Sequence, residues 1–374
     1  MNIIPISLAA LVPFSYYSHH GLRVAPFGVL LVYVFLFLYQ IFCSRFSSFL
    51  VYRNRYILSC SYIILMFAII SLAVSGNAQF ITSYLLFLTF LLWPFLLRKK
   101  DFNYKNYNHI IKIYVIGVIF CAVGVLFQVY SFFILGNEVF RVALFGGGRI
   151  AFSFLWKDFS FLSLYFVSAI PLVFIIFSRW ISIFVSVLLL VASVLTSART
   201  GIAALILFCF FYLIYALFRS TVTGTLSKNS IFLGISIFII VGFLVFVLSA
   251  IGVRQVTLAS TGRVESVMQA IHYWMAFPLF GSWMDPVRYD SGTIPHHILT
   301  YSLVMGGLVF SSLFFLWLFS AYHIIFSKNK FIFYSIVIAL LGFNFIPSFF
   351  SAYFLAFLFS LSIFYGQVYR NISY

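Results

Sequence analysis

Charged residues, and carboxylates above all, are scarce in this sequence. Only 7% of its 374 residues are Asp, Glu, Lys or Arg, and only 6 are acidic. A soluble domain carries about a quarter charged residues, so a chain of this length with so few cannot cover a water-facing surface. The carboxylates are also too few and too scattered for paired acid–base catalysis.

Cysteine is rare as well. The 4 cysteines are Cys43, Cys60, Cys121 and Cys209. They fall in or at the end of apolar segments and form no CxxC pair. We interpret them as small core residues rather than as disulfide partners or metal ligands.

Apolar residues make up 64% of the chain, with 52 Phe and 24 Tyr. Lipid must therefore be the solvent for most of the surface. A bilayer core about 30 Å thick needs roughly 20 apolar residues of helix, and the apolar runs give about twelve candidate spans. These begin near Asn2, Pro26, Tyr56, Phe80, Ile110, Phe159, Trp180, Gly201, Ile231, Thr300, Phe331 and Phe349. We predict an all-α polytopic integral membrane protein with one membrane domain over residues 1–374, in which Asn344 and Pro347 mark a turn or a kink.

The basic residues predict how the chain is oriented. The formal net charge is +16, but it lies in short clusters between apolar runs, which is typical of membrane topology rather than of nucleic-acid binding. Most Lys and Arg fall on the cytoplasmic side if both termini are cytoplasmic. The outer side then holds Arg23, Arg141, Arg149, Lys157, Arg199, Arg254, Arg263 and Arg288. Arginine suits phosphate because its planar fork of donors matches the oxygens, so we expect polar chemistry on the outer side.

Two outer segments place an arginine beside glycine. Phe145–Ile150 reads FGGGRI and predicts either a flexible loop or an anion cradle beside Arg149. Thr196–Gly201 reads TSARTG and places Arg199 at the junction of two apolar runs. An uncompensated arginine at membrane depth costs several kcal/mol, so Arg199 is expected to have a partner or an anionic ligand. The alternative is an arginine that snorkels or caps a helix at the interface.

A large outer loop is expected over residues 251–299. Within it, Thr261–Gly281 has the apolar periodicity of a helix that lies in the membrane surface, with Glu265 on the polar face. Arg263 lies in the first turn of this helix. Tethering of the chain would explain the helix, but it would not explain an arginine at that position.

Two adjacent histidines, His296 and His297, lie just before the tenth candidate span. Histidine exchanges a proton near neutral pH, so one of them is the natural general base. The alternative is an amphipathic histidine at the membrane interface. The outer segments contain no metal-ligand cluster, nucleophile elbow or P-loop, so we expect neither a metal nor another cofactor.

The order of these motifs resembles the superfamily of O-antigen ligases and polymerases, bacterial membrane enzymes of the Wzy and WaaL type. The motifs are SARTG, GRxxS at the start of an amphipathic helix, PLFG, and PHH with Gly307 downstream. The resemblance is sharp over Thr196–Phe310 and extends more loosely to Arg149. It implies about a dozen helices, a large periplasmic loop, and a glycan donor linked to undecaprenyl diphosphate. The glycan would pass to an acceptor hydroxyl with inversion and without a metal.

The resemblance also implies roles for particular residues. Arg199 and Arg263 match the two functional arginines, and His296 matches the family histidine. Where the family often has Asn, Ser or Gln after that histidine, this chain has His297, so either imidazole could face the substrate. Lys157 and Asp158 also replace an expected Pro-Asn pair. The substrate-binding residues are expected to be Arg149, Arg288, His297 and Glu265.

The favoured function is therefore an O-antigen polymerase in the bacterial inner membrane, with its active site facing the periplasm. Its acceptor would be a second lipid-linked repeat unit, and a partner that regulates chain length is expected from the resemblance. A ligase that transfers the glycan to lipid A-core shares the chemistry and is the first alternative. A transporter or flippase for lipid-linked sugars is the second, although it would carry more ionisable residues in mid-span positions.

Overall fold

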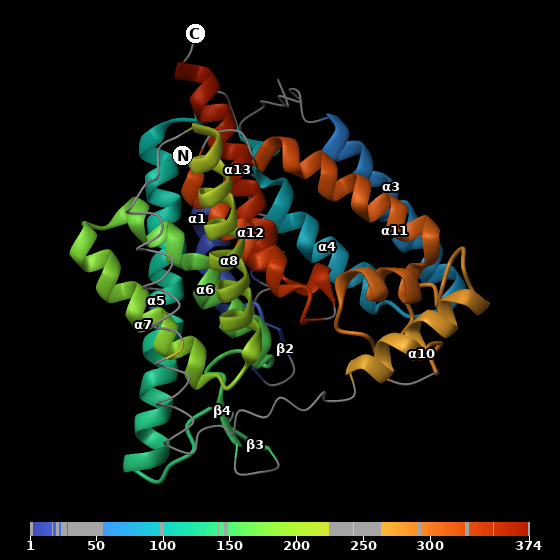
Figure 1. Ribbon diagram of the computed structural model, residues 1–374, viewed down its shortest axis with the longest axis horizontal. Helices are drawn as coiled ribbons and strands as arrows, with labels where there is room; N and C mark the ends of the chain where they lie inside the picture. The colour runs from blue at the N-terminus through green and yellow to red at the C-terminus, as the bar shows by residue number, and fades with distance from the viewer. Residues whose placement is uncertain are drawn as a thin grey trace. The chain divides into compact units, whose positions relative to one another are not determined.

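A computed structural model describes most of the chain. The described residues are 3–16, 18–19, 22–23, 28, 55–97, 101–140, 142–145, 149–223, 242, 263–290, 293–325, 329–346 and 348–372. They fall into two compact units, a first unit of Met1–Tyr114, Ala259–Ile336 and Phe343–Tyr374, and a second unit of Val115–Leu258 and Val337–Gly342. The described residues are mostly helical, with two short β hairpins (Figure 1), so the predicted helical class is confirmed.

Five helices are long and apolar enough to cross a membrane. Within the described residues they are Tyr56–Ser75, Tyr104–Ile134, Phe159–Ile176, Arg199–Ala216 and Ile298–Ala321. Shorter apolar helices cover Pro5–Phe14, Gln79–Phe95, Arg179–Leu195, Lys330–Gly342 and Tyr353–Tyr369. The candidate spans predicted from Pro26 and Ile231 lie outside the described residues. The number of spans stays a prediction, but the membrane character of the chain is supported by these helices.

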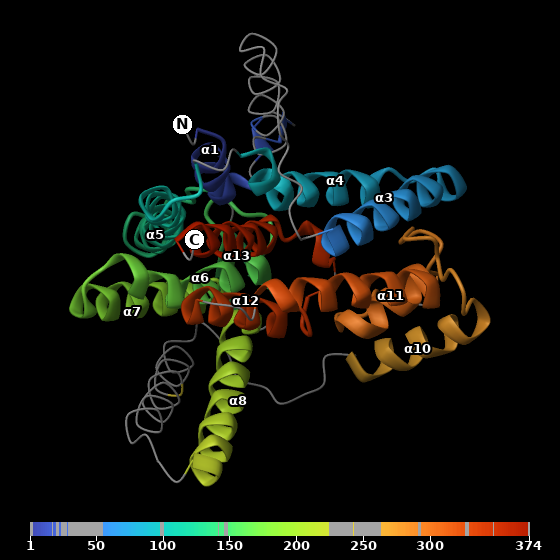
Figure 2. The same cartoon turned by 90° about the horizontal axis from the view of Figure 1, so that it is seen from above.

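The first unit is built from these helical segments: α1 (Ile3–Leu11), η1 (Val12–Phe14), α3 (Arg55–Ser75), α4 (Gln79–Leu92), η2 (Trp93–Leu96), α10 (Arg263–Ala276), α11 (Ile298–Ile325), η4 (Phe349–Ser351) and α13 (Tyr353–Ile372). It also contains a small hairpin of β1 (Ser18–His19) and β2 (Leu22–Arg23) and the first part of α5 (Tyr104–Ile134). Helix α3 packs against α4 and α11, and α10 packs against α11 (Figure 2). Helix α1 has nine residues, and a 3-10 turn containing Pro13 ends it.

Aromatic rings form the core of the first unit. Phe349, in η4, has its ring centroid 5.6 Å from that of Phe87 on α4 and 4.9 Å from that of Phe314 on α11. Phe350 continues the cluster, 4.9 Å from Tyr84 in an edge-to-face arrangement. These separations are typical of attractive aromatic pairs. The many phenylalanines here are packing residues, so no ligand is needed to explain them.

The second unit contains β3 (Val142–Phe145), β4 (Arg149–Phe152), α6 (Phe159–Ile176), α7 (Arg179–Leu195) and α8 (Arg199–Thr223). It also holds the rest of α5 and the end of α12 (Lys330–Gly342). Helix α6 packs against both α7 and α8. Asp158 caps α6, accepting hydrogen bonds from the backbone N–H groups of Ser160 and Phe161 at 2.7 and 3.1 Å. The FGGGRI segment joins an antiparallel pair in which Phe145 faces Arg149, a hairpin that an all-helical prediction did not include.

The interpretation of the cysteines agrees with the structure where it is described. Cys121 and Cys209 are buried and Cys60 is half-buried, and none of these three described cysteines forms a disulfide. Cys43 lies outside the described residues. Cys60 and Cys121 lie on different elements, α3 and α5.

Candidate functional site

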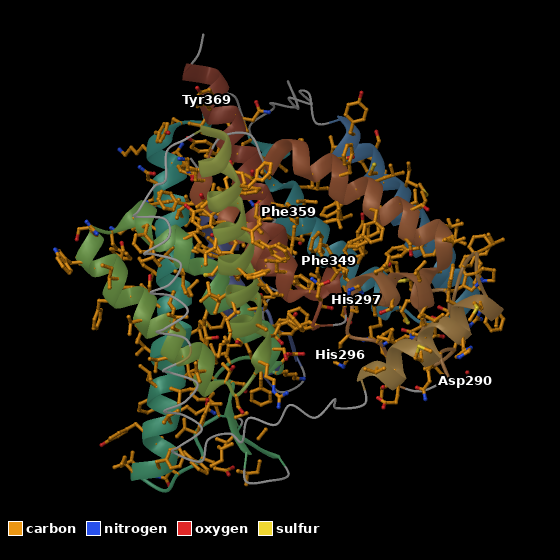
Figure 3. All side chains as sticks on the ribbon, viewed as in Figure 1. Asp290, His296, His297, Phe349, Phe359 and Tyr369 are labelled. Atoms are coloured by element: carbon orange, nitrogen blue, oxygen red, sulfur yellow. The ribbon has the colours of Figure 1, made fainter. Side chains whose placement is uncertain are left out.

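An open pocket of about 350 Å³ lies in the first unit, between α10, the turn before α11 and the turn after α12. It is lined by Val264, Ser266, Val267, Met268, His296, His297, Asn344 and Phe345. Figure 3 shows the two labelled histidines at the start of α11. A mostly apolar hollow with a few polar groups at one place is the usual form of a small-ligand site.

Helix α10 has three distinct faces. Its buried face carries Ser266, Ala270 and Tyr273. Its exposed apolar stripe carries Val264, Met268, Ile271 and Met275. Its exposed polar face carries Glu265, Gln269 and His272. The predicted amphipathic helix is therefore present. Its small and aromatic side chains face the protein. Its apolar stripe is exposed, and Val264 and Met268 of this stripe line the pocket, so the stripe is suited to contact with lipid or with a partner.

A backbone interlock joins the segment after α10 to the middle of α11. Helix α11 is broken at Gly307, which has φ +66° and ψ −166°. The interlock consists of Pro278–Met284 and Val304–Val309, joined by hydrogen bonds from Ser282 N to Val304 O (2.9 Å), Met284 N to Met305 O (2.6 Å), Leu308 N to Pro278 O (2.9 Å) and Val309 N to Leu279 O (3.1 Å). The backbone groups of Val304, Met305, Leu308 and Val309 thus find partners outside α11, as an apolar environment requires.

Two glycines make this close approach possible. A Cβ on Gly307 would lie 2.2 Å from the carbonyl oxygen of Leu279, and a Cβ on Gly281 would lie 2.2 Å from that of Val304. Both glycines also have positive φ, which side chains disfavour. The interlock therefore couples the end of α10 to α11, so that α10 and the turn before α11, which supply most of the pocket lining, are held as one piece.

A second set of contacts ties the loop between α10 and α11 to the turn between α3 and α4. The buried carboxylate of Asp285 accepts hydrogen bonds from Asn77 Nδ2 and Val287 N, both at 3.0 Å. Arg288 donates to the carbonyl oxygen of Val74, at the end of α3, at 2.6 Å, and its Nε lies 3.9 Å from Asp285. Arg288 was predicted to bind substrate; it does not line the pocket, and its guanidinium is engaged at the C-terminus of α3.

Tyr273 extends this contact from the buried face of α10. Its hydroxyl donates to the carbonyl oxygen of Arg288 at 3.1 Å, and its ring lies edge-on to Tyr289 at 5.0 Å. Burial raises the pKa of Tyr273, and the nearby carboxylate of Asp290 raises it further. The hydroxyl therefore stays protonated at neutral pH and remains a donor to the loop.

Both predicted histidines line the pocket, in different settings. His296 is exposed, whereas His297 is half-buried. The carbonyl oxygen of His297 accepts from Tyr301 N at 2.8 Å and from Thr300 Oγ1 at 3.1 Å, which fixes it at the first turn of α11. The Nδ1 of His297 is buried without a hydrogen-bond partner. An accessible imidazole is therefore supplied by His296, and a half-buried one by His297.

The arginine predicted beside these histidines begins α10. Arg263 is the first residue of the helix, and the next residue, Val264, lines the pocket. The side chain of Arg263 lies outside the described residues. Glu265 is exposed on the polar face and does not line the pocket. The first turn of α10 therefore lies at the pocket.

The other predicted arginines belong to the second unit. Arg199 is exposed at the first position of α8. The preceding turn is held by Thr196, whose hydroxyl donates to Ser193 O at 2.7 Å and accepts from Ala198 N at 3.3 Å. Gly201 N donates to Ser163 Oγ at 3.2 Å. Arg149 lies in β4, but its side chain is not described. The residues outside the described ranges include Arg141, Arg254 and the glycines at 146–148.

Sequence reasoning missed the contribution of the turn after α12. Asn344 was interpreted only as a turn or kink, and it lines the pocket together with Phe345. The signal was the amide itself, since a carboxamide in a long apolar run is costly unless it has a partner or a ligand. Among the described residues, no group of three His, Cys, Asp or Glu side chains could hold a metal ion.

Comparison with known proteins adds no relative to this description. No protein-family model matches the sequence, and the search of curated proteins finds none that is similar to it.

Proposed function

We propose that this chain is a membrane glycosyltransferase of the O-antigen polymerase type. It would join oligosaccharide repeat units carried on undecaprenyl diphosphate at the periplasmic face of the bacterial inner membrane. The observation that carries the proposal is the pocket where two imidazoles meet the first turn of the helix that Arg263 begins. The order of the motifs from Arg199 to His297 supports the same class.

The residues suit the chemistry of this transfer. A histidine, His296 in the first instance, takes the proton from the acceptor hydroxyl. The hydroxyl oxygen then bonds to the anomeric carbon of the donor sugar, on the face opposite the diphosphate, while the bond from that carbon to the diphosphate oxygen breaks. The negative charge that develops on the diphosphate is stabilised by the guanidinium of Arg263. The resemblance assigns Arg199 a role in the same transfer.

The proposed topology follows from the apolar helices and the basic loops. About twelve spans would place both termini in the cytoplasm and residues 251–299 in the periplasm. The exposed apolar stripe of α10 supports a position at the membrane surface, because Val264 and Met268 are 63% and 54% exposed while the opposite side of the helix is buried. A pocket at that depth is reached both by lipid carriers and by periplasmic sugars.

A glycan gel of cells that lack this chain, with and without a plasmid copy, tests the proposal. The polymerase predicts lipid A-core carrying a single repeat unit, with a full ladder restored by the plasmid. Bare core with long lipid-linked glycan behind it would make the chain a ligase instead. An unchanged ladder would overturn the proposed role in O-antigen synthesis.

A further inference from the structure

The turn after α12 supplies one wall of the pocket. Helix α12 ends at Gly342, and the next helical turn, η4, begins at Phe349. Non-helical backbone between apolar helices is tolerated where it is buried in protein or lines a cavity. Here Asn344 and Phe345 line the cavity, so the non-helical segment after α12 is placed to contact a ligand in that cavity.

Asn344 stands out in its part of the chain. It is the only Asn or Gln between Lys330 and Gly366, in a stretch that is otherwise mostly apolar. Its side chain is half-buried in the pocket wall. A carboxamide has two N–H donors and one acceptor oxygen, so a group of this kind in a pocket wall is suited to binding a polar ligand.

The pocket has two kinds of lining. His296, His297 and Asn344 present polar groups, whereas Val264, Met268 and Phe345 present apolar ones. A sugar ring fits such a lining, since the hydroxyl groups on its edge pair with the polar groups and the C–H groups on its face pack on the apolar ones. The volume of about 350 Å³ is at the low end for ligand sites, which suits one sugar residue rather than a long oligosaccharide.

We infer that Asn344 is a specificity-determining residue, whose carboxamide binds the hydroxyl groups of one sugar residue of the acceptor beside His296 and His297. This inference rests on the proposed function, and it adds a residue that orients the acceptor. Binding of the amide to ring hydroxyls turns one hydroxyl toward the imidazole, so Asn344 helps to select the hydroxyl that is joined. His296, His297 and Asn344 contact the acceptor, and arginine binds the diphosphate of the donor.

The test uses the full-length protein in detergent with an alkyl glycoside of the repeat unit. This compound accepts a glycan but cannot donate one, because it carries no diphosphate. Binding is measured by tryptophan fluorescence, and transfer is measured with the native lipid-linked donor. Asn344→Leu, of nearly the same size, is expected to raise both Kd and acceptor KM about tenfold, which corresponds to about 1.4 kcal/mol. Donor KM should not change.

Two further variants separate a binding role from a structural one. Asn344→Gln retains the carboxamide and should recover part of the loss, which a packing defect would not. Gln79→Ala alters an exposed amide on α4 that does not line the pocket, and it should match the unaltered protein. If Asn344→Leu does not accumulate, the smaller Asn344→Ser replaces it with the same expectation.

The possible outcomes distinguish this inference from the proposed function. If Asn344→Leu binds and accepts normally, the inference is wrong and the glycosyltransferase stands. If the unaltered protein binds the glycoside without transferring to it, the proposed reaction is wrong, and weaker binding by Asn344→Leu would still support the sugar site. If the unaltered protein does not bind the glycoside, the inference is wrong.

Discussion

Replacing Gly307 with alanine should open the interlock between the segment after α10 and the middle of α11. The new Cβ would lie 2.2 Å from the carbonyl oxygen of Leu279 and 2.4 Å from the backbone nitrogen of Phe280. Both atoms belong to backbone, so no flexible side chain can move aside. The backbone at Gly307 also has a conformation that is open almost only to glycine, at a cost of about 1–3 kcal/mol for other residues.

The magnitude follows from the bonds at risk. The interlock contains four backbone hydrogen bonds, and each contributes about 0.5–1.5 kcal/mol net. Loss of two of them together with the backbone strain gives a destabilisation of about 2–6 kcal/mol. The stability of a whole domain is only about 5–15 kcal/mol, so a large fraction of it would be lost.

Two other glycines of the first unit serve as matched controls. A Cβ on Gly366 in α13 would meet nothing within 4 Å, and this glycine does not have a positive φ. Gly366→Ala should therefore stabilise slightly, by about 0.5–1 kcal/mol. A Cβ on Gly76 also meets nothing, but its φ is +72°, so Gly76→Ala should cost about 1–2 kcal/mol from strain alone.

Thermal denaturation of the purified variants in detergent gives the order of stability. The reasoning predicts Gly366→Ala above the unaltered protein, then Gly76→Ala, then Gly307→Ala far below. If Gly307→Ala had the same melting temperature as Gly366→Ala, the interlock would be refuted, because a methyl group could then be accommodated at Gly307 without breaking it.

Other predictions concern the cap, the outer loop and the arginines. Asp158→Ala should destabilise the protein by about 0.5–2 kcal/mol, because α6 loses its N-terminal cap, and an unchanged melting curve would argue against that cap. Asp285→Ala should speed proteolysis of the loop after α10, because the amide of Asn77 loses its acceptor at a cost of about 1–3 kcal/mol; equal cleavage rates would contradict this. Arg199→Ala and Arg263→Ala should abolish transfer at unchanged membrane levels, and normal activity in either variant would remove that arginine from the mechanism.

The sequence predicts best those features that depend on local periodicity. The expected spans near Tyr56, Phe80 and Phe159 begin within one residue of α3, α4 and α6. The surface helix was expected from its apolar pattern, and Arg263 does begin α10. Apolar runs and helical spacing are properties of neighbouring residues, so one chain is enough to reveal them.

Features that depend on distant parts of the chain were not predictable in this way. The interlock pairs Pro278 with Leu308, and nothing in either segment alone names its partner. Arg288 carries the same charge as the other outer arginines, yet it binds the end of α3, because its role depends on where Val74 lies. Asn344 likewise lines the same pocket as His296, although the two residues lie far apart in the sequence.

Purified protein in liposomes, supplied only with the lipid-linked repeat unit, tests the central claim most directly. The proposed function predicts a ladder of lipid-linked oligomers from the unaltered protein and an unextended repeat unit from Arg263→Ala. An unaltered protein that leaves the repeat unit unextended, while remaining folded by its melting curve, would contradict the claim that this chain is the polymerase.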